Sequence, residues 1–318
     1  MSDADLISRI ENPDPNQHLH IRDLHVEPSS FCNARCPGCP RNASGYNIPE
    51  LFTQNNLSVE RFKEILYQFP NVVTILFNGN LGDPMMNPHI VDLTELTKAQ
   101  CTINTNGSIG RLKDYEKLAQ RKVSMYFSID GLEDTNHLYR QDVQWSKVME
   151  RAKAFIDAGG DAVWKFILFK HNSHQVDDAR SLSKQMGFRN FEVDDHGRNH
   201  FPALTKDKKI SHWILPADGS AQPDDNFDVD AYIEMIRNPI NLNPHRYSCK
   251  VNCMHLSGSA YISAKGGVHP CCFQGFDLPD RKSVPLDDFP KLQKTWNTDN
   301  VDLVCGSNCE AVGHLSLD

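Results

Sequence analysis

The sequence predicts an α/β fold, a partial (β/α)6 TIM-like barrel of parallel strands followed by a small C-terminal cysteine-rich domain with a β-hairpin and a helix. Two observations predict this arrangement. From residue 20 to about residue 195, strand-like and helix-like segments alternate in six units, which is typical of a parallel sheet with helical crossovers. Beyond residue 245 that alternation is absent, and six of the ten cysteines follow.

The elements of the barrel are predicted from side-chain periodicity and from stop signals. Ser58 is a suitable N-cap for the amphipathic segment that follows it, and Gly187 is a suitable terminator for the last helix. The expected strands lie over residues 20–27, 72–77, 101–105, 124–129, 163–169 and 188–193. The expected helices lie over residues 58–69, 88–99, 111–120, 145–158 and 173–186.

The rest of the chain has a different pattern. Asp, Pro, Gly and Asn are frequent after residue 196, with one helix expected near 228–237, so this part is interpreted as a linker or a loop that covers the barrel mouth. The segment AYISAKGGVHP, from Ala260, predicts a hairpin that turns at Gly266-Gly267. We expect an N-terminal extension over residues 1–19 and the barrel over residues 20–200. A linker or loop region then covers residues 201–245, and a cysteine-rich domain covers residues 246–318.

Composition excludes several classes of function. The net charge is −8 and the Lys and Arg residues are scattered, which argues against general nucleic-acid binding. The first residues, MSDADLISRIENPDP, contain no apolar core of signal-peptide length, and no apolar stretch is long enough to cross a bilayer. We therefore expect a cytoplasmic protein without a membrane partner. In a reducing cytoplasm, ten cysteines indicate metal ligation or redox chemistry rather than disulfides.

The first cysteine motif follows the first expected strand. Cys32, Cys36 and Cys39 have the spacing C-x3-C-x2-C. Three thiolates on one loop can bind three irons of a cubane cluster and leave the fourth iron open for a chelating ligand. A zinc site with a distant fourth ligand and an accidental spacing are the alternatives.

At this point the sequence resembles the radical S-adenosylmethionine (SAM) superfamily, in five places over residues 20–195. They are the cysteine loop, Gly79-Asn-Leu-Gly-Asp-Pro, Thr105-Asn-Gly, Ser128-Ile-Asp-Gly with Arg140 after it, and the strand from Trp164 to Phe169. The resemblance implies that Cys32, Cys36 and Cys39 bind a [4Fe–4S] cluster and that its open iron binds SAM. It also implies a set of SAM-binding residues, namely Gly79, Gly82, Asp83, Asn106, Ser128, Asp130 and Arg140.

Two positions depart from the pattern of this superfamily. Gly38 stands where many relatives have an aromatic residue, just before the third cysteine. Asp83 stands where glutamate is usual, which moves the carboxylate by one methylene group.

The C-terminal cysteines suggest a second metal site. Cys253, Gly266 and Cys271 fit the pattern C-x(9–15)-G-x4-C, and a C-x3-C pair follows at Cys305 and Cys309. This resembles the SPASM and twitch domains, and it implies an auxiliary [4Fe–4S] cluster bound by Cys253, Cys271, Cys305 and Cys309, with Cys249 or Cys272 as replacements. A zinc ribbon with four cysteine ligands is the alternative. Cys101, within a strand, is interpreted as a buried thiol.

The resemblance implies a function. A reduced donor such as flavodoxin or ferredoxin supplies one electron, SAM is cleaved to a 5′-deoxyadenosyl radical, and the radical abstracts hydrogen from a substrate. Oxidative modification or epimerisation of a peptide is the first expectation. A small-molecule dehydrogenase or epimerase acting on a sugar-like or aminoglycoside-like substrate is the second. A non-catalytic iron–sulfur or zinc protein is the third. No catalytic residue is assigned from the sequence.

Overall fold

The computed structural model describes residues 18, 21–49, 52–195, 200–237, 258–269 and 271–272. Within them, an eight-stranded sheet has the order β12-β11-β1-β4-β5-β6-β7-β8, and all neighbours are parallel except β11 and β12. Its strands are β1 (Asp23–Val26), β4 (Thr74–Phe77), β5 (Gln100–Thr105), β6 (Ser124–Ser128), β7 (Asp161–Ile167), β8 (Asn190–Asp194), β11 (Ser259–Ile262) and β12 (Val268–His269).

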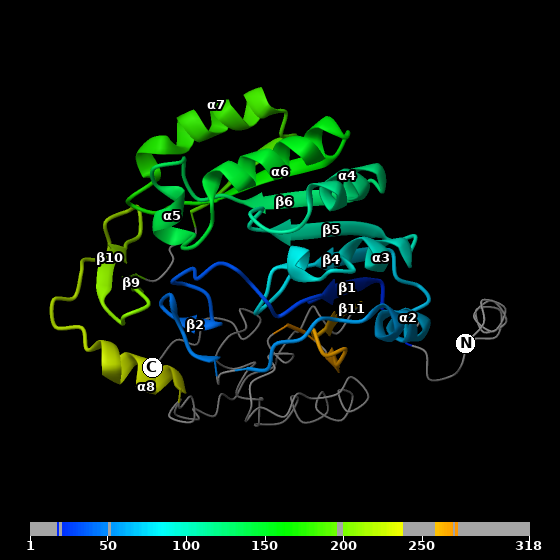
Figure 1. Cartoon of the computed structure of the whole chain (residues 1–318), viewed down its shortest axis with the longest axis horizontal. Helices are drawn as coiled ribbons and strands as arrows, with labels where there is room; N and C mark the ends of the chain where they lie inside the picture. Colours follow the sequence, from blue (N-terminus) through cyan, green and yellow to red (C-terminus); the bar gives the residue numbers. More distant parts are fainter. Residues whose placement is uncertain are drawn as a thin grey trace, which may run out of the picture.

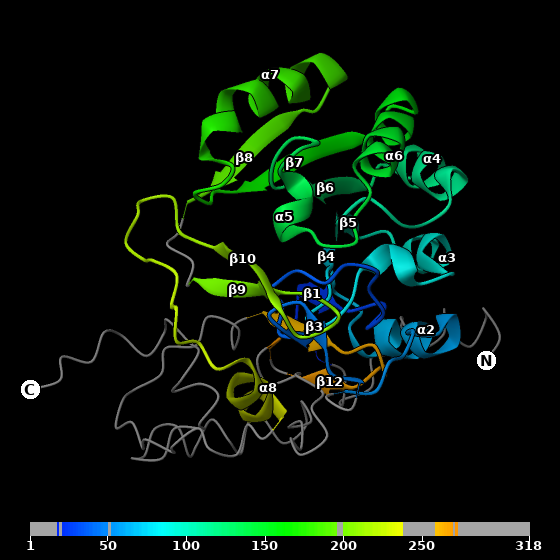
Figure 2. The same ribbon diagram turned by 60° about the vertical axis from the view of Figure 1, so that its left-hand side comes forward.

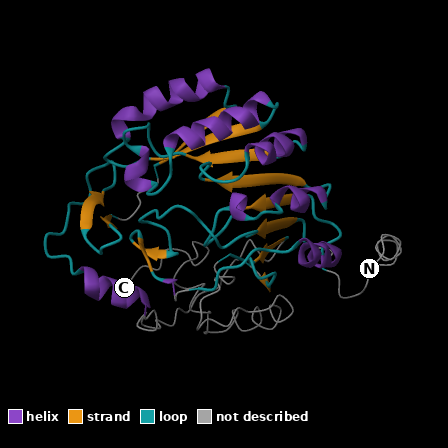
Figure 3. Ribbon diagram, in the orientation of Figure 1, coloured by secondary structure: helices purple, strands orange, loops and turns teal. Residues whose placement is uncertain are grey.

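Helices lie along one side of this sheet (Figures 1 and 3). They are α2 (Val59–Gln68), α3 (Ile90–Glu95), α4 (Leu112–Gln120), α6 (Trp145–Asp157) and α7 (Val176–Met186). Each expected strand and helix of the barrel has a counterpart, with ends that differ by a few residues. Ser58 caps α2 by accepting a hydrogen bond of 3.1 Å from the Arg61 amide, and Gly187 ends α7 with φ of 92°. None of the described helices is long and apolar enough to span a bilayer.

The core lies between the sheet and these helices. Strand β6 shows the alternation: Met125 and Phe127 are fully buried, whereas Ser124, Tyr126 and Ser128 are half-buried. The Phe127 ring packs against aromatic rings of α4, of α6 and of the segment between α7 and β8. The residues of β6 that alternate with this buried pair lie on the opposite face of the sheet, where Ser128 lines a pocket.

The predicted hairpin over residues 260–270 is present as β11 and β12, but its first strand joins the barrel sheet. Strand β11 pairs in parallel with β1, from Asp23 opposite Ser259 to Val26 opposite Ile262. The turn lies against α2, because the Arg61 guanidinium donates to the Gly266 carbonyl at 2.9 and 3.1 Å. Pairing with β11 satisfies the backbone edge that β1 would otherwise expose. The sheet therefore extends past residue 246, where the sequence placed the start of the last domain.

The segment over residues 200–237 is more ordered than the expected linker. It contains the predicted helix, α8 (Val229–Arg237), and an antiparallel hairpin that the sequence did not predict, β9 (Phe201–Leu204) and β10 (Ile210–Ile214). Figure 2 shows this hairpin and α8 beside the short ladder β2 (Asn42–Ala43) and β3 (Tyr46–Asn47). A second hydrophobic cluster joins them, formed by Ala43, Ile48, Phe52, Leu81, Leu204 and Ile233.

A largely buried histidine lies where this hairpin meets the barrel. The His171 ring stacks on Phe169 with centroids 5.4 Å apart, and neither ring nitrogen has a hydrogen-bond partner. The pKa of His171 is lowered to about 4, chiefly by burial and also by the neighbouring His212, His137 and His174. His212, on β10, is hydrogen-bonded through Nε2 to the Leu138 carbonyl at 3.0 Å. His171 is therefore neutral in the folded protein at neutral pH.

This histidine makes stability depend on pH. Its folded pKa lies below its unfolded value of about 6.5, so its contribution is complete above about pH 6.5 and is lost as the pH falls toward 4. Between about pH 7.5 and about pH 5.5, we expect the wild-type protein to lose about 1 kcal/mol more unfolding free energy than His171→Asn. Urea unfolding of both proteins at the two pH values measures this. Equal losses would contradict the assignment.

Candidate functional site

The loops that follow β1, β4, β5 and β6 meet at the carboxyl ends of the strands. They enclose a pocket of about 160 Å³. Parallel barrels place their ligands at this end of the sheet. Nine of the ten barrel residues that the sequence singled out line the pocket, namely Cys32, Cys36, Cys39, Gly79, Gly82, Asp83, Asn106, Ser128 and Arg140. The tenth, Asp130, lies behind the wall and is fully buried.

The three cysteines lie on one loop, and polar hydrogens are directed at two of their sulfurs. The Ala34 amide donates to Cys32 Sγ at 3.4 Å, and Asn106 Nδ2 lies 3.8 Å from the same sulfur. Arg140 Nη1 lies 3.7 Å from Cys36 Sγ. Donors and cations of this kind stabilise thiolates, which are the form of cysteine that binds metal.

Without metal the thiols of Cys32 and Cys36 are not ionised. The pKa of the Cys32 thiol is raised to about 12, chiefly by burial and also by Asp83, against the lowering effect of Arg41. Burial also raises the pKa of Cys36, against the lowering effect of Arg140. Metal is therefore needed to hold these sulfurs as thiolates, because its positive charge replaces the missing solvation.

The donor set fits a cluster. No three His, Cys, Asp or Glu side chains of the described ranges converge closely enough to hold one metal ion. In a cubane each thiolate binds a different iron, so the three sulfurs need not converge on one point. A loop with three cysteines beside a polar pocket could hold a [4Fe–4S] cluster through these sulfurs.

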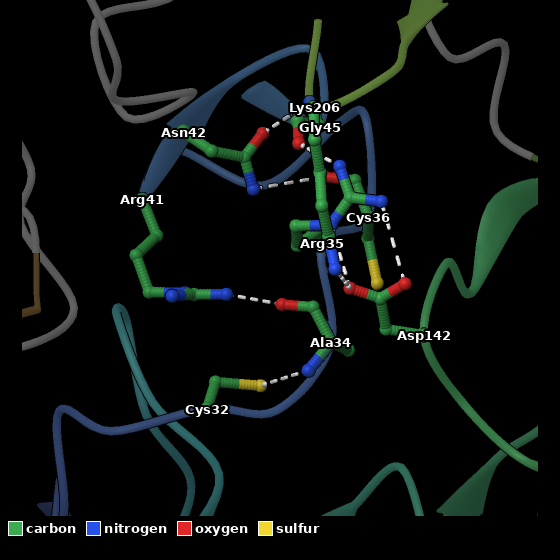
Figure 4. A network of polar contacts seen from close by, with 9 residues as sticks. All are labelled: Cys32, Ala34, Arg35, Cys36, Arg41, Asn42, Gly45, Asp142 and Lys206. Carbon is green, nitrogen blue, oxygen red and sulfur yellow. Dashed lines mark hydrogen bonds and ion pairs between the residues drawn. The ribbon is translucent and has the colours of Figure 1, made fainter. Parts of the chain in front are cut away.

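The cysteine loop is fixed from both sides by polar contacts (Figure 4). Arg35 Nε donates to Asp142 at 2.7 Å, and its Nη1 donates to the Gly45 carbonyl at 2.6 Å. Asn42 accepts from the Gly45 amide through its side-chain oxygen, and its Nδ2 donates to the Cys36 carbonyl at 3.3 Å. The loop conformation is therefore set by the protein, which limits the rearrangement that cluster binding requires.

A buried glutamate holds the loop after β4. Glu27 Oε1 accepts from the amides of Leu81 at 2.6 Å and Gly82 at 3.2 Å. Its Oε2 accepts from the Tyr261 hydroxyl, on β11, at 2.9 Å. A Cβ atom on Gly82 would lie 1.9 Å from the Ser29 carbonyl oxygen, so only glycine fits there. Sequence reasoning missed Glu27; its one signal was an acidic residue at the end of a buried strand.

Asp83 connects two loops of the pocket. Its carboxylate accepts from the Met85 amide at 2.9 Å, the Asn106 amide at 2.8 Å, and the Thr105 hydroxyl at 2.8 and 3.0 Å. Through the Met85 bond it caps the 3₁₀ helix η2 (Pro84–Met86). Burial raises the pKa of Asp83, and these donors lower it. Asp83 thus both lines the pocket and organises its wall.

Asp130 positions Arg140 from behind the pocket. Asp130 Oδ2 accepts from Arg140 Nε at 2.6 Å, and Oδ1 accepts from the Ile167 amide at 2.7 Å. Arg140 follows the short helix α5 (Asn136–Tyr139) and reaches the pocket, whereas Asp130 does not. The ion pair therefore brings one oriented cation to the cysteine loop.

The C-terminal cysteines are described only in part. Cys271 and Cys272 are described, while Cys249, Cys253, Cys305 and Cys309 lie outside the described residues. The Cys272 carbonyl accepts from Asn80 Nδ2 at 2.8 Å, and Asn80 lines the pocket. The segment that carries Cys271 and Cys272 is therefore beside the loop after β4.

The role of Glu27 in holding the loop after β4 can be tested by measuring the free energy of unfolding. Glu27→Ala leaves the buried Leu81 amide, the partly buried Gly82 amide and the Tyr261 hydroxyl without this acceptor, so we expect a loss of about 3 kcal/mol or more in unfolding free energy. Tyr261→Phe, the matched control, removes one of these bonds and should cost about 1 kcal/mol. Urea unfolding measures both. A loss in Glu27→Ala no larger than that in Tyr261→Phe would contradict the role in holding the loop.

The comparisons with known proteins agree with this geometry. No curated protein matches the chain. SuiB of Streptococcus suis bound to S-adenosylmethionine aligns with a TM-score of 0.53 and 17% identity, over 95% of this chain and 71% of that chain. A histidine-tagged form of anSMEcpe with bound AdoMet aligns with a TM-score of 0.54 and 16% identity, over 88% of this chain and 80% of that chain. These likenesses show a shared fold. Residues 26–179 match the model of the Radical SAM superfamily, so this part of the chain is similar to a radical SAM domain.

Proposed function

We propose that this protein is a radical SAM enzyme that removes a hydrogen atom from a peptide substrate, for oxidative modification or epimerisation. The observation that carries the proposal is the convergence of the cysteine loop and the loops after β4, β5 and β6 on one pocket. In this proposal Cys32, Cys36 and Cys39 hold a [4Fe–4S] cluster. With SAM bound, one-electron reduction of that group supplies a 5′-deoxyadenosyl radical.

The residues of the chain have separate roles in this proposal. Backbone groups near Gly79 and Gly82, in the loop that Glu27 holds, bind SAM together with Asn106 and Ser128. Arg140 binds a carboxylate or ribose oxygen of SAM and is oriented by Asp130. Asp83 keeps the wall in place and contributes negative charge near the SAM amino group.

A peptide substrate is proposed from the structural neighbours. SuiB has been solved with the precursor peptide SuiA, and anSMEcpe with the Cp18Cys peptide together with AdoMet. The present chain aligns with those structures over 93% and 91% of its length, at TM-scores of 0.53 and 0.52. The similarity of fold supports the same class of substrate here.

We further propose an auxiliary [4Fe–4S] cluster bound by Cys253, Cys271, Cys305 and Cys309, with Cys249 or Cys272 as possible replacements. The bond from Asn80 to Cys272 supports it, since it brings this segment next to a residue of the pocket. Four thiolates leave no open iron, so this cluster would accept an electron from the substrate or pass one inward. A reduced flavodoxin or ferredoxin of the cytoplasm would supply the electron that starts the reaction.

The cofactor proposal is tested by anaerobic reconstitution. We expect about eight irons per chain, and 5′-deoxyadenosine on addition of SAM and dithionite. Replacing Cys32, Cys36 and Cys39 together by Ala should remove about half of the iron and all of the 5′-deoxyadenosine. If the triple cysteine variant contains zinc and no iron, the proposed auxiliary cluster is contradicted. If the iron-loaded protein cleaves no SAM, with or without peptide, the proposal that it is a radical SAM enzyme is contradicted.

The substrate class is tested by incubating the reconstituted enzyme with synthetic peptides and analysing the peptides by mass spectrometry. Cross-linking removes hydrogen from the peptide, and epimerisation in D₂O adds solvent deuterium to it. The triple cysteine variant is the control. An unchanged peptide, together with SAM cleavage stimulated by a sugar or aminoglycoside alcohol, would favour the small-molecule reaction instead.

A further inference from the structure

Three arginines lie around the cysteine loop, and two of them are paired with carboxylates. Arg35 forms an ion pair with Asp142 at 2.7 Å. Arg140 forms one with Asp130 at 2.6 Å. Each of these guanidinium groups is compensated by a carboxylate before any cofactor binds.

The third arginine, Arg41, is different. It is only 6% exposed, and no carboxylate pairs with it in the part of the chain that the structure describes. Its Nη2 donates to the Ala34 carbonyl, inside the loop between Cys32 and Cys36. Its Nε is buried and has no hydrogen-bond partner. Figure 4 shows the side chain extended toward the segment that contains Cys32 and Ala34.

Such a group is costly in isolation. Burying a cation without a counter-charge costs several kcal/mol, and a buried N–H without an acceptor adds to this cost. The conformation of Arg41 therefore indicates a negatively charged neighbour in the functional state. The candidate is the cysteine loop, because Arg41 Nη2 donates to the Ala34 carbonyl between Cys32 and Cys36.

The charge on that loop depends on the cluster. Thiolates and sulfides of a bound cluster are negative, and one-electron reduction adds one more negative charge at the same place. The negative charge of Asp83 also acts on Cys32, and the positive charge of Arg41 opposes its effect. A fixed cation close to the cluster stabilises the reduced state more than the oxidised state.

We propose that Arg41 is the counter-charge of the cluster on Cys32, Cys36 and Cys39 and that it raises the reduction potential of that cluster. The inference rests on the proposed function, since it needs this cluster to be present. The step concerned is the gain of one electron from a reductant such as dithionite, which takes the cluster from the 2+ to the 1+ state without breaking a bond. Arg41 is a positioning residue in this scheme, not a catalytic one.

The test is a redox titration of the reconstituted full-length protein without SAM. It follows the part of the electron paramagnetic resonance signal that the triple cysteine variant lacks, because a reduced auxiliary cluster also gives a signal. Arg41→Gln removes the charge, and we expect it to lower the equilibrium constant for reduction about tenfold, which corresponds to about 59 mV for one electron. Arg41→Lys keeps the charge and should stay close to wild type. Lys206→Gln is the control, because Lys206 is 75% exposed beside Asp142 and water screens its charge.

Each outcome decides the proposal. A potential in Arg41→Gln that equals the wild-type value would overturn it, and so would an equal shift in Lys206→Gln. If Arg41→Gln fails to retain iron, Arg41→Lys decides alone: a wild-type potential supports the counter-charge, and a tenfold change contradicts it. Loss of the signal in the triple cysteine variant, with no shift in Arg41→Gln, would overturn this inference and leave the proposed function standing. A wild-type protein with no such cluster would overturn both.

Discussion

The buried carboxylate of Glu27 is the group on which the arrangement of the pocket depends. It lies directly after β1, and it accepts hydrogen bonds from the loop after β4 and from Tyr261 of β11. One side chain thereby joins three neighbouring strands at their carboxyl ends. Parallel strands bring their following loops to one edge, but sheet geometry alone does not fix the conformation of those loops. Here the buried Glu27 carboxylate fixes the loop after β4. The Asp83 carboxylate in turn joins the loop after β4 to the loop after β5.

Much of the barrel could be predicted from the sequence because its signals are local. Alternation of apolar residues, the Ser58 cap and the Gly187 terminator all act within a few residues. Loops at strand ends then brought nine of the ten expected pocket residues together, since their convergence follows from parallel topology. Asp130 is the exception. Its motif position suggested a ligand contact, whereas its side chain faces Arg140 and the Ile167 amide behind the wall.

The parts that could not be predicted depend on distant partners. The hairpin β9–β10 contains Pro202 and turns through Lys208 without glycine, so its local signals are weak; packing of Leu204 against Ala43 and Ile233 helps to form it. The partner of β11 is likewise set by the open edge of β1, more than two hundred residues away. Glu27 and Arg41 were missed for a related reason: their importance lies in which buried donors or charges surround them, and periodicity carries no information on that.

The long separation between Glu27 and Tyr261 has a consequence for biosynthesis. These residues are 234 positions apart, and their bond joins the first strand of the barrel to one near the end of the chain. On the ribosome, β1 is made early but keeps an open edge until β11 has emerged, because a strand cannot pair with a segment that is not yet synthesised. Contacts between residues so far apart in the sequence are also slow to form. The pocket is therefore completed late in translation, and until then the loops at the carboxyl ends of the first strands lack the contact with β11 that holds them in the folded protein.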